Sequence, residues 1–306
     1  MGVCRHSRNE RLHGVRVLVL GSNGFIGARF VKMFSDKYEI VAESYDGSRR
    51  DHDCTIYDNA LSILDACKPA AIVNLAGKSY HTATNDADIY ESNLLIQLNV
   101  HEACARLRIR PKIVLCSSSA VYASSRDPVE EHSPCAPVNT YAKAKYMQER
   151  IALSYHPEQH VVIARLFNVV GPFQNRDFFI PSIIDRLVRY KKKEAATVPL
   201  KTLNAMRDFV YIDDVCGALS TLIERGAPGE VYNVCCGSGV SIQNVIDTVV
   251  EMLELSDVVL DVKEDFVKEG ISYQVGSNKK LLKLGWTPLY SIKDSLEAII
   301  REEYGS

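Results

Sequence analysis

Tyr141 and Lys145 stand four residues apart in the segment Tyr141-Ala142-Lys143-Ala144-Lys145. On a helix, residues at i and i+4 share one face, so the phenol and the ammonium would be neighbours. A free tyrosine titrates near pH ~10, and an adjacent cation favours the phenolate. The pair therefore predicts an acid/base group that works near neutral pH, with Tyr141 as the acid/base and Lys145 as its support. Such a spacing also arises by chance, so the motif is evidence for an active site only if the neighbouring segments support it.

A run of serines, Ser117 to Ser119, directly follows an apolar segment at residues 112–116. If that segment is a parallel strand, its carboxyl end lies where ligands bind. We expect Ser118 to hydrogen-bond the same substrate oxygen as Tyr141. The alternative interpretation is a plain serine-rich turn.

A glycine-rich segment, Gly21-Ser22-Asn23-Gly24-Phe25-Ile26-Gly27, follows the apolar residues 15–20 and opens a helical pattern over residues 25–35. Glycines permit a tight turn and a close approach to a pyrophosphate, and a helix N-terminus offers unpaired N–H groups and a partial positive charge. This order of elements predicts a dinucleotide site. Its residues would be Gly21, Asn23, Gly24, Phe25, Ile26 and Gly27.

The choice between NADP and NAD depends on the end of the next strand, over residues 39–44. Ser44 at the strand end, with Arg49 near a 2′-phosphate, favours NADP(H). Glu43 or Asp46 at the ribose favours NAD(H). We expect NADP(H), with NAD(H) as the alternative and a solvated turn as the other interpretation of Arg49.

Alternating strands and helices must position these residues. We expect an α/β fold, a Rossmann-type doubly wound parallel sheet with a smaller mixed C-terminal substrate domain. Residues 12–170 and about 207–236 would bind the dinucleotide, and about 171–206 and 237–306 the nucleotide sugar. Residues 207–215 and 231–235 would return to the sheet. The other expected strands are 15–20, 39–44, 71–75, 112–116 and 161–166, and the expected helices are 25–35, 59–67, 86–107 and 141–155.

The composition is that of an ordinary globular protein, with 306 residues, 46% hydrophobic, and a formal net charge of -2. Neither nucleic acid nor an anionic membrane is an expected partner. The 9 cysteines form no C-x-x-C pair, so we expect no zinc site, no other metal, and a reducing compartment. Residues 1–13 are polar and resemble a loose tail rather than a secretory signal, and no apolar run reaches the length of a membrane span. We expect a cytoplasmic protein.

Residues 15–300 resemble the extended short-chain dehydrogenases/reductases, a family of nucleotide-sugar epimerases, dehydratases and ketoreductases. The resemblance implies that Ser118, four residues before Tyr122, is the active serine and Tyr141 the general acid/base. Lys145 would tune Tyr141 and hold the nicotinamide ribose. Asp53 and Cys54 would contact the adenine. Leu75, Ala76, Gly77, Asn93 and Phe167 would also border the cofactor. A homodimer is a further expectation from the family.

The same resemblance implies the substrate contacts. Arg165-Leu166-Phe167-Asn168-Val169-Val170-Gly171-Pro172 matches the family's R-x-x-N-x-x-G-P, and Met206-Arg207-Asp208-Phe209 its R-D-F element. Asn168 would approach the sugar or its phosphate, and Arg207 the diphosphate. Ser118 and Ser119 would contact the sugar. An arginine expected before Gly276 is missing, and Lys268 would take its place as a point charge.

The C-terminal third is most similar to the GDP-4-keto-6-deoxymannose reductases. Ser119 and Ala120 occupy positions where similar 4,6-dehydratases carry acids, so elimination is disfavoured. Reduction needs only a hydride from NAD(P)H and a proton from Tyr141. Two alternatives stay open: a nucleotide-sugar 4-epimerase with retained NAD, and a non-catalytic cofactor-binding regulatory protein. The chain also lacks the glutamate that the reductases carry after the active serine.

Overall fold

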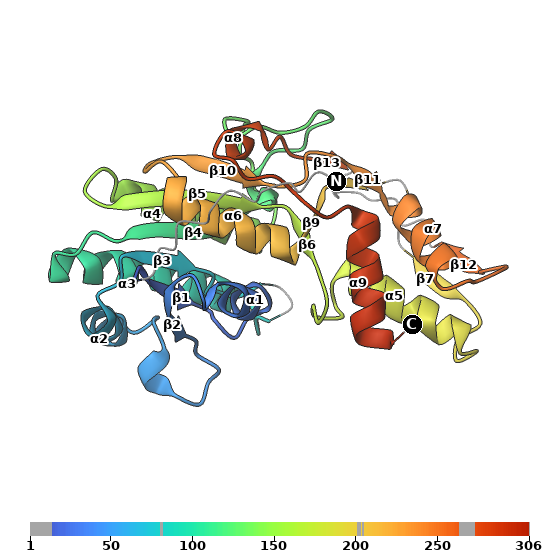
Figure 1. Cartoon of the computed structure of the whole chain (residues 1–306), viewed down its shortest axis with the longest axis horizontal. Helices are drawn as coiled ribbons and strands as arrows, with labels where there is room; N and C mark the ends of the chain where they lie inside the picture. The colour runs from blue at the N-terminus through green and yellow to red at the C-terminus, as the bar shows by residue number, and fades with distance from the viewer. Residues whose placement is uncertain (1–13, 80–81, 201–202, 204, 263–272, 306) are drawn as a thin grey trace, which may run out of the picture.

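The computed structural model describes residues 14–79, 82–200, 203, 205–262 and 273–305. Its central element is a sheet of six parallel strands, which confirms the expected α/β Rossmann-type fold (Figure 1). In spatial order the strands are β10 (Val231–Val234), β5 (His160–Leu166), β4 (Lys112–Ser118), β3 (Ala71–Asn74), β1 (Arg16–Leu20) and β2 (Glu39–Glu43).

Strand β1 is the point at which the chain reverses its direction across the sheet. β2 pairs with one side of β1, and β3, the next strand in sequence, pairs with the other side. Ligands of open parallel sheets bind outside the carboxyl ends of the strands at such a switch point. The fold therefore places a binding site at the ends of β1 and β3.

Helices cover both faces of the sheet. Successive side chains of each strand point to opposite faces and so pack into two different cores. Val17 and Val19 of β1 belong to the core beside α1 and α6, whereas Leu18 and Leu20 belong to the core beside α2 and α3. The helices α2 and α3 pack on each other, as do α3 and α4, and α1 packs on α6. Their bounds are α1 (Phe25–Phe34), α2 (Tyr57–Cys67), α3 (Asp86–Leu107), α4 (Thr140–Ser154) and α6 (Ile212–Arg225).

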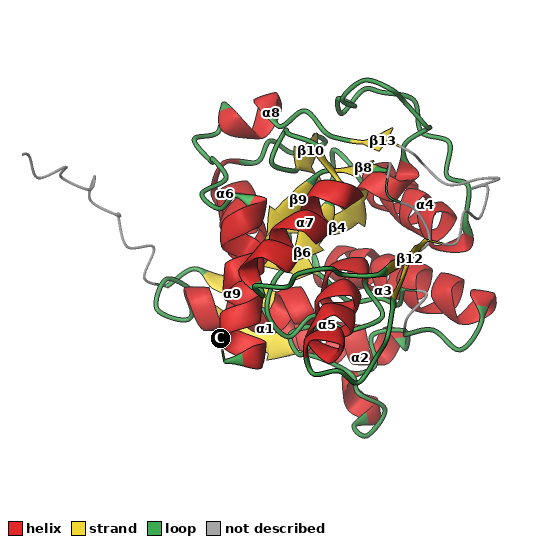
Figure 2. Ribbon diagram, turned by 90° about the vertical axis from the view of Figure 1, so that its right-hand side faces the viewer, coloured by secondary structure: helices red, strands yellow, loops and turns green. Residues whose placement is uncertain are grey.

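A smaller lobe lies beyond the carboxyl ends of the strands (Figure 1), and its helices stand in front of the sheet in Figure 2. Its core is built from isoleucine, leucine and valine side chains of three helices and two short strands. These elements are α5 (Phe179–Lys191), α7 (Ile242–Met252), α9 (Ile292–Tyr304), β7 (Val198–Leu200) and β12 (Leu260–Val262). A single-turn helix, α8 (Lys279–Leu282), lies beside β10.

One expectation about the sheet is wrong. Residues 207–215 do not add a strand to it, although β10 does join it at the edge beside β5. The segment instead forms β8 (Met206–Arg207) and β9 (Phe209–Tyr211), and then the first turn of α6. The physical reason is Asp208, whose buried carboxylate accepts hydrogen bonds from the backbone N–H groups of Cys236, Gly237 and Gly276.

The short strands tie the two lobes together. β9 pairs in parallel with β6 (Asn168–Val170), which continues directly from β5. β8 lies between β11 (Val240–Ser241) and β13 (Tyr273–Gln274). Arg207 and Gln274 are register partners in this small sheet.

Candidate active site

The turn between β1 and α1 is shaped by two glycines. Gly21 has a φ of +82°, and a Cβ there would lie 2.9 Å from the backbone nitrogen of Ala76, so only glycine fits beside the turn that follows β3. A Cβ at Gly27 would collide with the carbonyl oxygen of Gly21. The helix can therefore begin directly against the strand end, as the glycine spacing predicted.

The first turn of α1 offers donors to an anion. Its N-cap, Gly24, has no side chain to cap the backbone, and the turn carries no acidic residue. The N–H groups of a helix start are unsatisfied within the helix and carry a partial positive charge. This arrangement suits a pyrophosphate.

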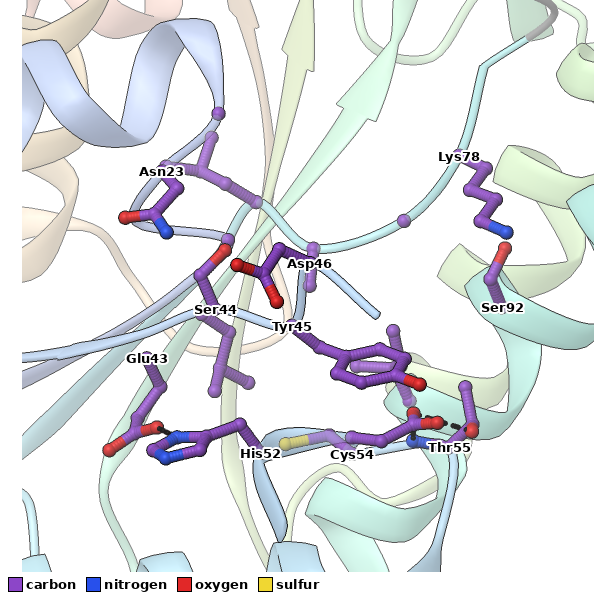
Figure 3. Close-up of a pocket in the computed structure, with 18 of the residues that line it drawn as sticks. Asn23, Glu43, Ser44, Tyr45, Asp46, His52, Cys54, Thr55, Lys78 and Ser92 are labelled. Carbon is purple, nitrogen blue, oxygen red and sulfur yellow. Dashed lines mark hydrogen bonds and ion pairs between the residues drawn. The ribbon is translucent and has the colours of Figure 1, made fainter. Parts of the chain in front are cut away.

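A cavity of about 510 Å³ opens at this point and extends along the ends of β1, β2 and β3 (Figure 3). Six of its lining residues are among those predicted for the cofactor on the glycine turn and after β3. The predicted residues that line it are Gly21, Asn23, Gly24, Ser44, Asp53, Cys54, Leu75, Ala76 and Gly77. Its size and its glycine-lined end fit a dinucleotide.

The end of β2 presents acidic groups to this cavity. Glu43, Ser44 and Asp46 all line it, and Figure 3 shows Ser44 and Asp46 between Asn23 and the Cys54–Thr55 segment. The Glu43 carboxylate pairs with His52, and the Asp46 carboxylate accepts from the backbone and hydroxyl of Ser48. Both groups that were considered for the ribose therefore face the cofactor cavity.

Arg49, the expected 2′-phosphate contact, points elsewhere. Its guanidinium pairs with Asp51 at 3.0 Å, both side chains are 68% exposed, and Arg49 is absent from the cavity lining. Arg49 therefore lies in a solvent-exposed turn in this structure.

The two predicted adenine contacts line the cavity, and the helix asparagine lies behind it. Asp53 accepts hydrogen bonds from the backbone and hydroxyl of Thr55. The backbone carbonyl of Cys54 accepts from Asn99. Asn93 is fully buried and donates to the carbonyl oxygens of Lys78 and Ile89. Asn93 thus fixes the segment after Gly77 rather than lining the cavity itself.

Helix α4 brings Tyr141 to the serine at the end of β4. The helix begins after Asn139, whose side-chain oxygen accepts from the N–H of Ala142 at 2.9 Å. Tyr141 lies in the first turn, and its side chain hydrogen-bonds Ser118. Ser118 also accepts from the N–H of Ala120 at 3.2 Å, which fixes the position of its hydroxyl oxygen. The predicted Ser118–Tyr141 pair is thus formed by the fold.

Lys145 lies one turn further along α4 and is buried. Its ammonium donates to the backbone carbonyl of Cys116 and to the side-chain oxygen of Gln148, each at 3.0 Å. Burial lowers the pKa of Lys145 to about 8, against the opposing effects of Cys116 and Glu149. The cation is therefore held by β4, the strand that carries Ser118.

The electrostatics of Tyr141 differ from the expectation. Burial raises the pKa of Tyr141, and the hydrogen bond with Ser118 only partly offsets that effect. The sequence predicts that the ammonium of Lys145 lowers this pKa. Desolvation of the phenolate is the largest effect on this pKa, so the hydroxyl keeps its proton at neutral pH.

The predicted substrate residues come from several elements. The Ser119 hydroxyl accepts from the Gln274 side chain at 2.9 Å. Arg207 is half-buried, and its guanidinium donates to the carbonyl oxygen of Met206. Burial lowers its pKa, and no carboxylate of the described residues forms a salt bridge with it.

Three other predicted residues have different surroundings. Asn168 donates from its side chain to the backbone carbonyl of Asp208 at 3.0 Å, so it joins β6 to the R-D-F segment. Phe167 is buried in a small core with Val121 and Cys235, and does not line the cavity. Lys268 lies outside the described residues.

Sequence reasoning missed several side chains that build this site. Gln274 was not singled out, because its contact with Ser119 spans 155 positions. Glu149 was also missed, although it stands four residues after Lys145 on the same helix face. The spacing of Tyr141, Lys145 and Glu149 was the available signal.

Within the described ranges no group of histidine, cysteine, aspartate and glutamate side chains has the arrangement of a metal site. No helix there combines the length and the apolarity that a membrane span requires.

Comparison with known proteins agrees with this geometry. A relative from Aggregatibacter actinomycetemcomitans, a GDP-6-deoxy-D-talose 4-dehydrogenase, is 28% identical over 95% of this chain and 97% of its own length. A GDP-6-deoxy-D-mannose reductase from Pseudomonas aeruginosa is also 28% identical, over 94% of this chain and 96% of its own.

The solved structure of RMD from Pseudomonas aeruginosa complexed with NADPH superposes with a TM-score of 0.83 and 27% identity. The superposition covers 95% of this chain and 99% of that one. The family model for the NAD dependent epimerase/dehydratase family matches residues 17–235, which include the glycine-rich turn, Ser118, Tyr141 and Lys145. The chain belongs to the NAD dependent epimerase/dehydratase family.

Proposed function

We propose that this enzyme reduces a 4-keto-6-deoxy nucleotide sugar with NAD(P)H, with GDP-4-keto-6-deoxymannose as the specific candidate. The relatives named above are an oxidoreductase pair acting on GDP-linked 6-deoxy sugars, and both span nearly the whole chain. The dinucleotide cavity and the Ser118–Tyr141 pair supply the two functions that such a reaction needs.

The Ser118–Tyr141 pair can serve reduction. Tyr141 is half-buried, the pKa of its phenol is raised by desolvation, and its side chain is hydrogen-bonded to Ser118. A reductase needs a proton donor at the ketone oxygen, and a phenol that keeps its proton meets this need. A 4-epimerase would use the same tyrosine first as a base and then as an acid, so the preference for reduction rests on the two oxidoreductase relatives named above.

The residues divide the chemistry as follows. Bound in the cavity lined by Gly21, Gly24 and Ala76, a reduced dinucleotide would supply the hydride for the ketone carbon. Tyr141 gives its hydroxyl proton to the ketone oxygen, while Ser118 holds the same oxygen in place. The Lys145 ammonium lowers the cost of the negative charge that develops on the Tyr141 oxygen.

Arg207 is the proposed ligand of the substrate's diphosphate. Among the described residues, the half-buried Arg207 guanidinium donates to a backbone carbonyl and to no carboxylate, and such a group gains more from an anion than an exposed one does. Gln274, its register partner, reaches Ser119, so the small sheet extends from the diphosphate end to the active-serine turn. Asn168 joins β6 to the same segment.

The proposed division of the chain follows from these positions. All residues that line the cofactor cavity lie between Leu20 and Ile96, within the region 12–170 assigned to the dinucleotide together with 207–236. The region of residues 171–206 and 237–306 supplies Gln274 for the sugar. Arg207 stands at the boundary between them.

The experiment is to mix the protein with NADPH or NADH and a panel of 4-keto-6-deoxy nucleotide sugars, following the absorbance of the reduced nicotinamide. We expect stoichiometric oxidation with at least one keto sugar. Interconversion of a sugar without net oxidation would indicate the epimerase instead. Cofactor binding without turnover of any keto or hydroxy nucleotide sugar would indicate a regulatory protein.

A further inference from the structure

Four polar side chains lie together inside the layer between the sheet and helix α3. Asn74 ends β3, Gln97 and His101 stand one turn apart on α3, and Gln159 precedes β5. Their exposed fractions are 1%, 0%, 0% and 4%. Buried polar groups without partners are costly, so such a group of side chains needs an explanation.

These side chains form one continuous series of hydrogen bonds, the Asn74–Gln159 network. Asn74 Nδ2 lies 2.7 Å from Gln97 Oε1, Gln97 Nε2 lies 2.6 Å from His101 Nε2, and His101 Nδ1 lies 2.5 Å from Gln159 Oε1. Asn74 Oδ1 accepts from the backbone N–H of Ala76 at 3.1 Å. The Gln159 amide nitrogen donates to the backbone carbonyl of His101 at 2.9 Å.

The direction of the network is fixed by its two ends. The N–H of Ala76 can only donate, so the Asn74 oxygen faces it and the Asn74 amide nitrogen must donate onward to Gln97. Gln97 then donates to His101 Nε2, which must be an unprotonated acceptor. At the far end a carbonyl can only accept, so the Gln159 oxygen must face His101 Nδ1. His101 is therefore neutral, with its proton on Nδ1.

The surroundings of His101 support the neutral form. Burial lowers the pKa of His101, the hydrogen bond to Gln159 and the Glu102 carboxylate oppose this, and burial is the largest effect. The Tyr155 ring from the end of α4 stacks on the imidazole at 4.5 Å, and the Tyr155 hydroxyl donates to Glu102. Glu102 and Tyr155 are thus the titratable groups that α3 and α4 present to His101, while Asn74 and Gln159 are the polar groups from the sheet side.

The near end of the network is the cofactor cavity. Ala76 lines that cavity between Leu75 and Gly77, and the turn that contains it packs against Gly21 of the glycine-rich turn. The backbone N–H of Ala76 is held by Asn74, whose orientation depends on Gln97 and His101. We propose that Gln97 and His101 are positioning residues for the dinucleotide, acting through Asn74 on the Ala76 turn.

Protonation of His101 would reverse the donors and acceptors along the network. Nε2 would then have to donate, so the Gln97 amide would have to turn over and present its nitrogen to Asn74. Asn74 would turn in response and place its own nitrogen against the N–H of Ala76. Two donors would face each other at the wall of the cavity, so the Ala76 turn would move. The proposal rests on the proposed function only for the identity of the ligand.

The first test is cofactor affinity in two matched variants. His101→Leu removes both ring nitrogens, and Val100→Ala removes an equally buried apolar group from the adjacent position on α3. We expect the Kd of NADPH and of NADH to rise roughly three- to tenfold in His101→Leu, and to stay unchanged in Val100→Ala at a similar loss of thermal stability. Equal Kd values in the two variants would overturn the proposal.

The second test is the polarity of the network, read by NMR of the wild-type protein. The ¹⁵N shifts of His101 should show a protonated Nδ1 and an unprotonated Nε2 from pH 8 down to pH 5.5. An Nε2–H tautomer in that range would overturn the proposal even if His101→Leu does not fold.

The substitution Asn74→Asp should reverse the direction of the hydrogen bonds between Gln97 and His101. Its carboxylate can accept from both the Ala76 N–H and the Gln97 amide, so Gln97 turns its oxygen to His101 and Nε2 must carry a proton. The titration midpoint of His101 should therefore be higher in Asn74→Asp than in the wild type. A midpoint that does not change contradicts the proposed direction.

The two proposals fail separately. If the wild-type protein binds neither NADPH nor NADH, the proposed function falls. The positioning role is then judged by the Ala76 amide alone, whose chemical shift and hydrogen exchange should change in His101→Leu and not in Val100→Ala. An Ala76 amide that is the same in both variants would overturn the positioning role.

Discussion

Glu149 and Arg165 form a buried pair joined by two hydrogen bonds, of 2.9 Å from Arg165 Nε and 2.7 Å from Arg165 Nη2. Glu149 belongs to α4, the helix of Tyr141 and Lys145, and Arg165 belongs to β5. The Ser117 hydroxyl also donates to Glu149, at 2.5 Å. The pair therefore fixes α4 on the sheet at a defined rotation and height, one turn beyond Lys145.

Replacing Glu149 with Gln should destabilise the protein strongly. The Arg165 guanidinium would stay buried without its counter-charge, and breaking one partner of a buried pair costs about 3–5 kcal/mol. Urea denaturation would measure this loss in the free energy of unfolding. The matched control is Glu39→Gln, which removes the partner of Arg16 from a largely exposed pair and should cost less than about 1 kcal/mol. Similar losses in the two variants would contradict a structural role for the buried pair.

Replacing Tyr141 with Phe removes one hydroxyl and leaves the ring. The rate of keto-sugar reduction should fall about 10²- to 10⁴-fold, because the ketone oxygen loses its proton donor. The Kd of NADPH should change little, since the cavity lining does not include Tyr141. Single-turnover oxidation of the reduced nicotinamide measures the rate, and a fluorescence titration measures the Kd. A variant that keeps the wild-type rate would exclude Tyr141 as the proton donor.

Local patterns in the sequence predicted the regular elements well. Continuous apolar runs become the buried strands β1, β3, β4 and β5, and the expected helix over residues 86–107 has the bounds of α3. The glycine spacing predicted the β1–α1 turn, because the requirement for glycine is a local one. Ser118 and Tyr141 were found because each stands at a fixed place relative to its own element.

Contacts between distant segments could not be predicted in the same way. Asp208 draws residues 236, 237 and 276 around its carboxylate, so the segment after Arg207 leaves the sheet. Arg49 is instead a local case, because it pairs with Asp51 two positions away, as in the solvated turn that was its alternative interpretation. Gln97 and His101 on α3 gave no signal, because their other partners, Asn74 and Gln159, lie 23 and 58 positions away.

Replacing Asp46 with Asn should improve the binding of NADPH relative to NADH. A carboxylate that lines the cavity repels a 2′-phosphate, and the amide removes this repulsion without changing the shape. We expect the ratio of the two Kd values to shift several-fold towards NADPH, and the measurement is a titration with each dinucleotide.

Asp51→Asn is the control for Asp46. Its side chain is 68% exposed and does not line the cavity, so this variant should leave the ratio nearer the wild-type value. An unchanged ratio in Asp46→Asn, or an equal shift in Asp51→Asn, would show that Asp46 does not face the ribose.

The buried Asp208 should make stability depend on pH. Burial raises the pKa of Asp208 to about 7 from its usual 3.8, against three opposing backbone hydrogen bonds. Between these values the folded state holds a proton that the unfolded state has lost, so this group's contribution to stability falls as pH rises from about 4 to 7. Asp208→Asn cannot titrate at this position. The unfolding free energy of the wild type should therefore fall relative to that of Asp208→Asn as pH rises from about 4 to 7. A difference that is constant with pH would contradict the raised pKa.

Lys145 should set the upper limit of the pH profile for reduction. Burial lowers its pKa from 10.5 to about 8, so it becomes neutral as pH rises through that value. Neutral Lys145 no longer stabilises the charge that develops on Tyr141, and kcat/KM should fall about tenfold per pH unit above pH 8. Lys145→Arg keeps its charge over the whole range, so its profile should stay flat at a lower rate. Lys143, exposed on the same helix, serves as the control, because Lys143→Met should retain the wild-type profile. A wild-type rate that stays constant from pH 7 to pH 9.5 would rule out Lys145 as the group that limits the reaction.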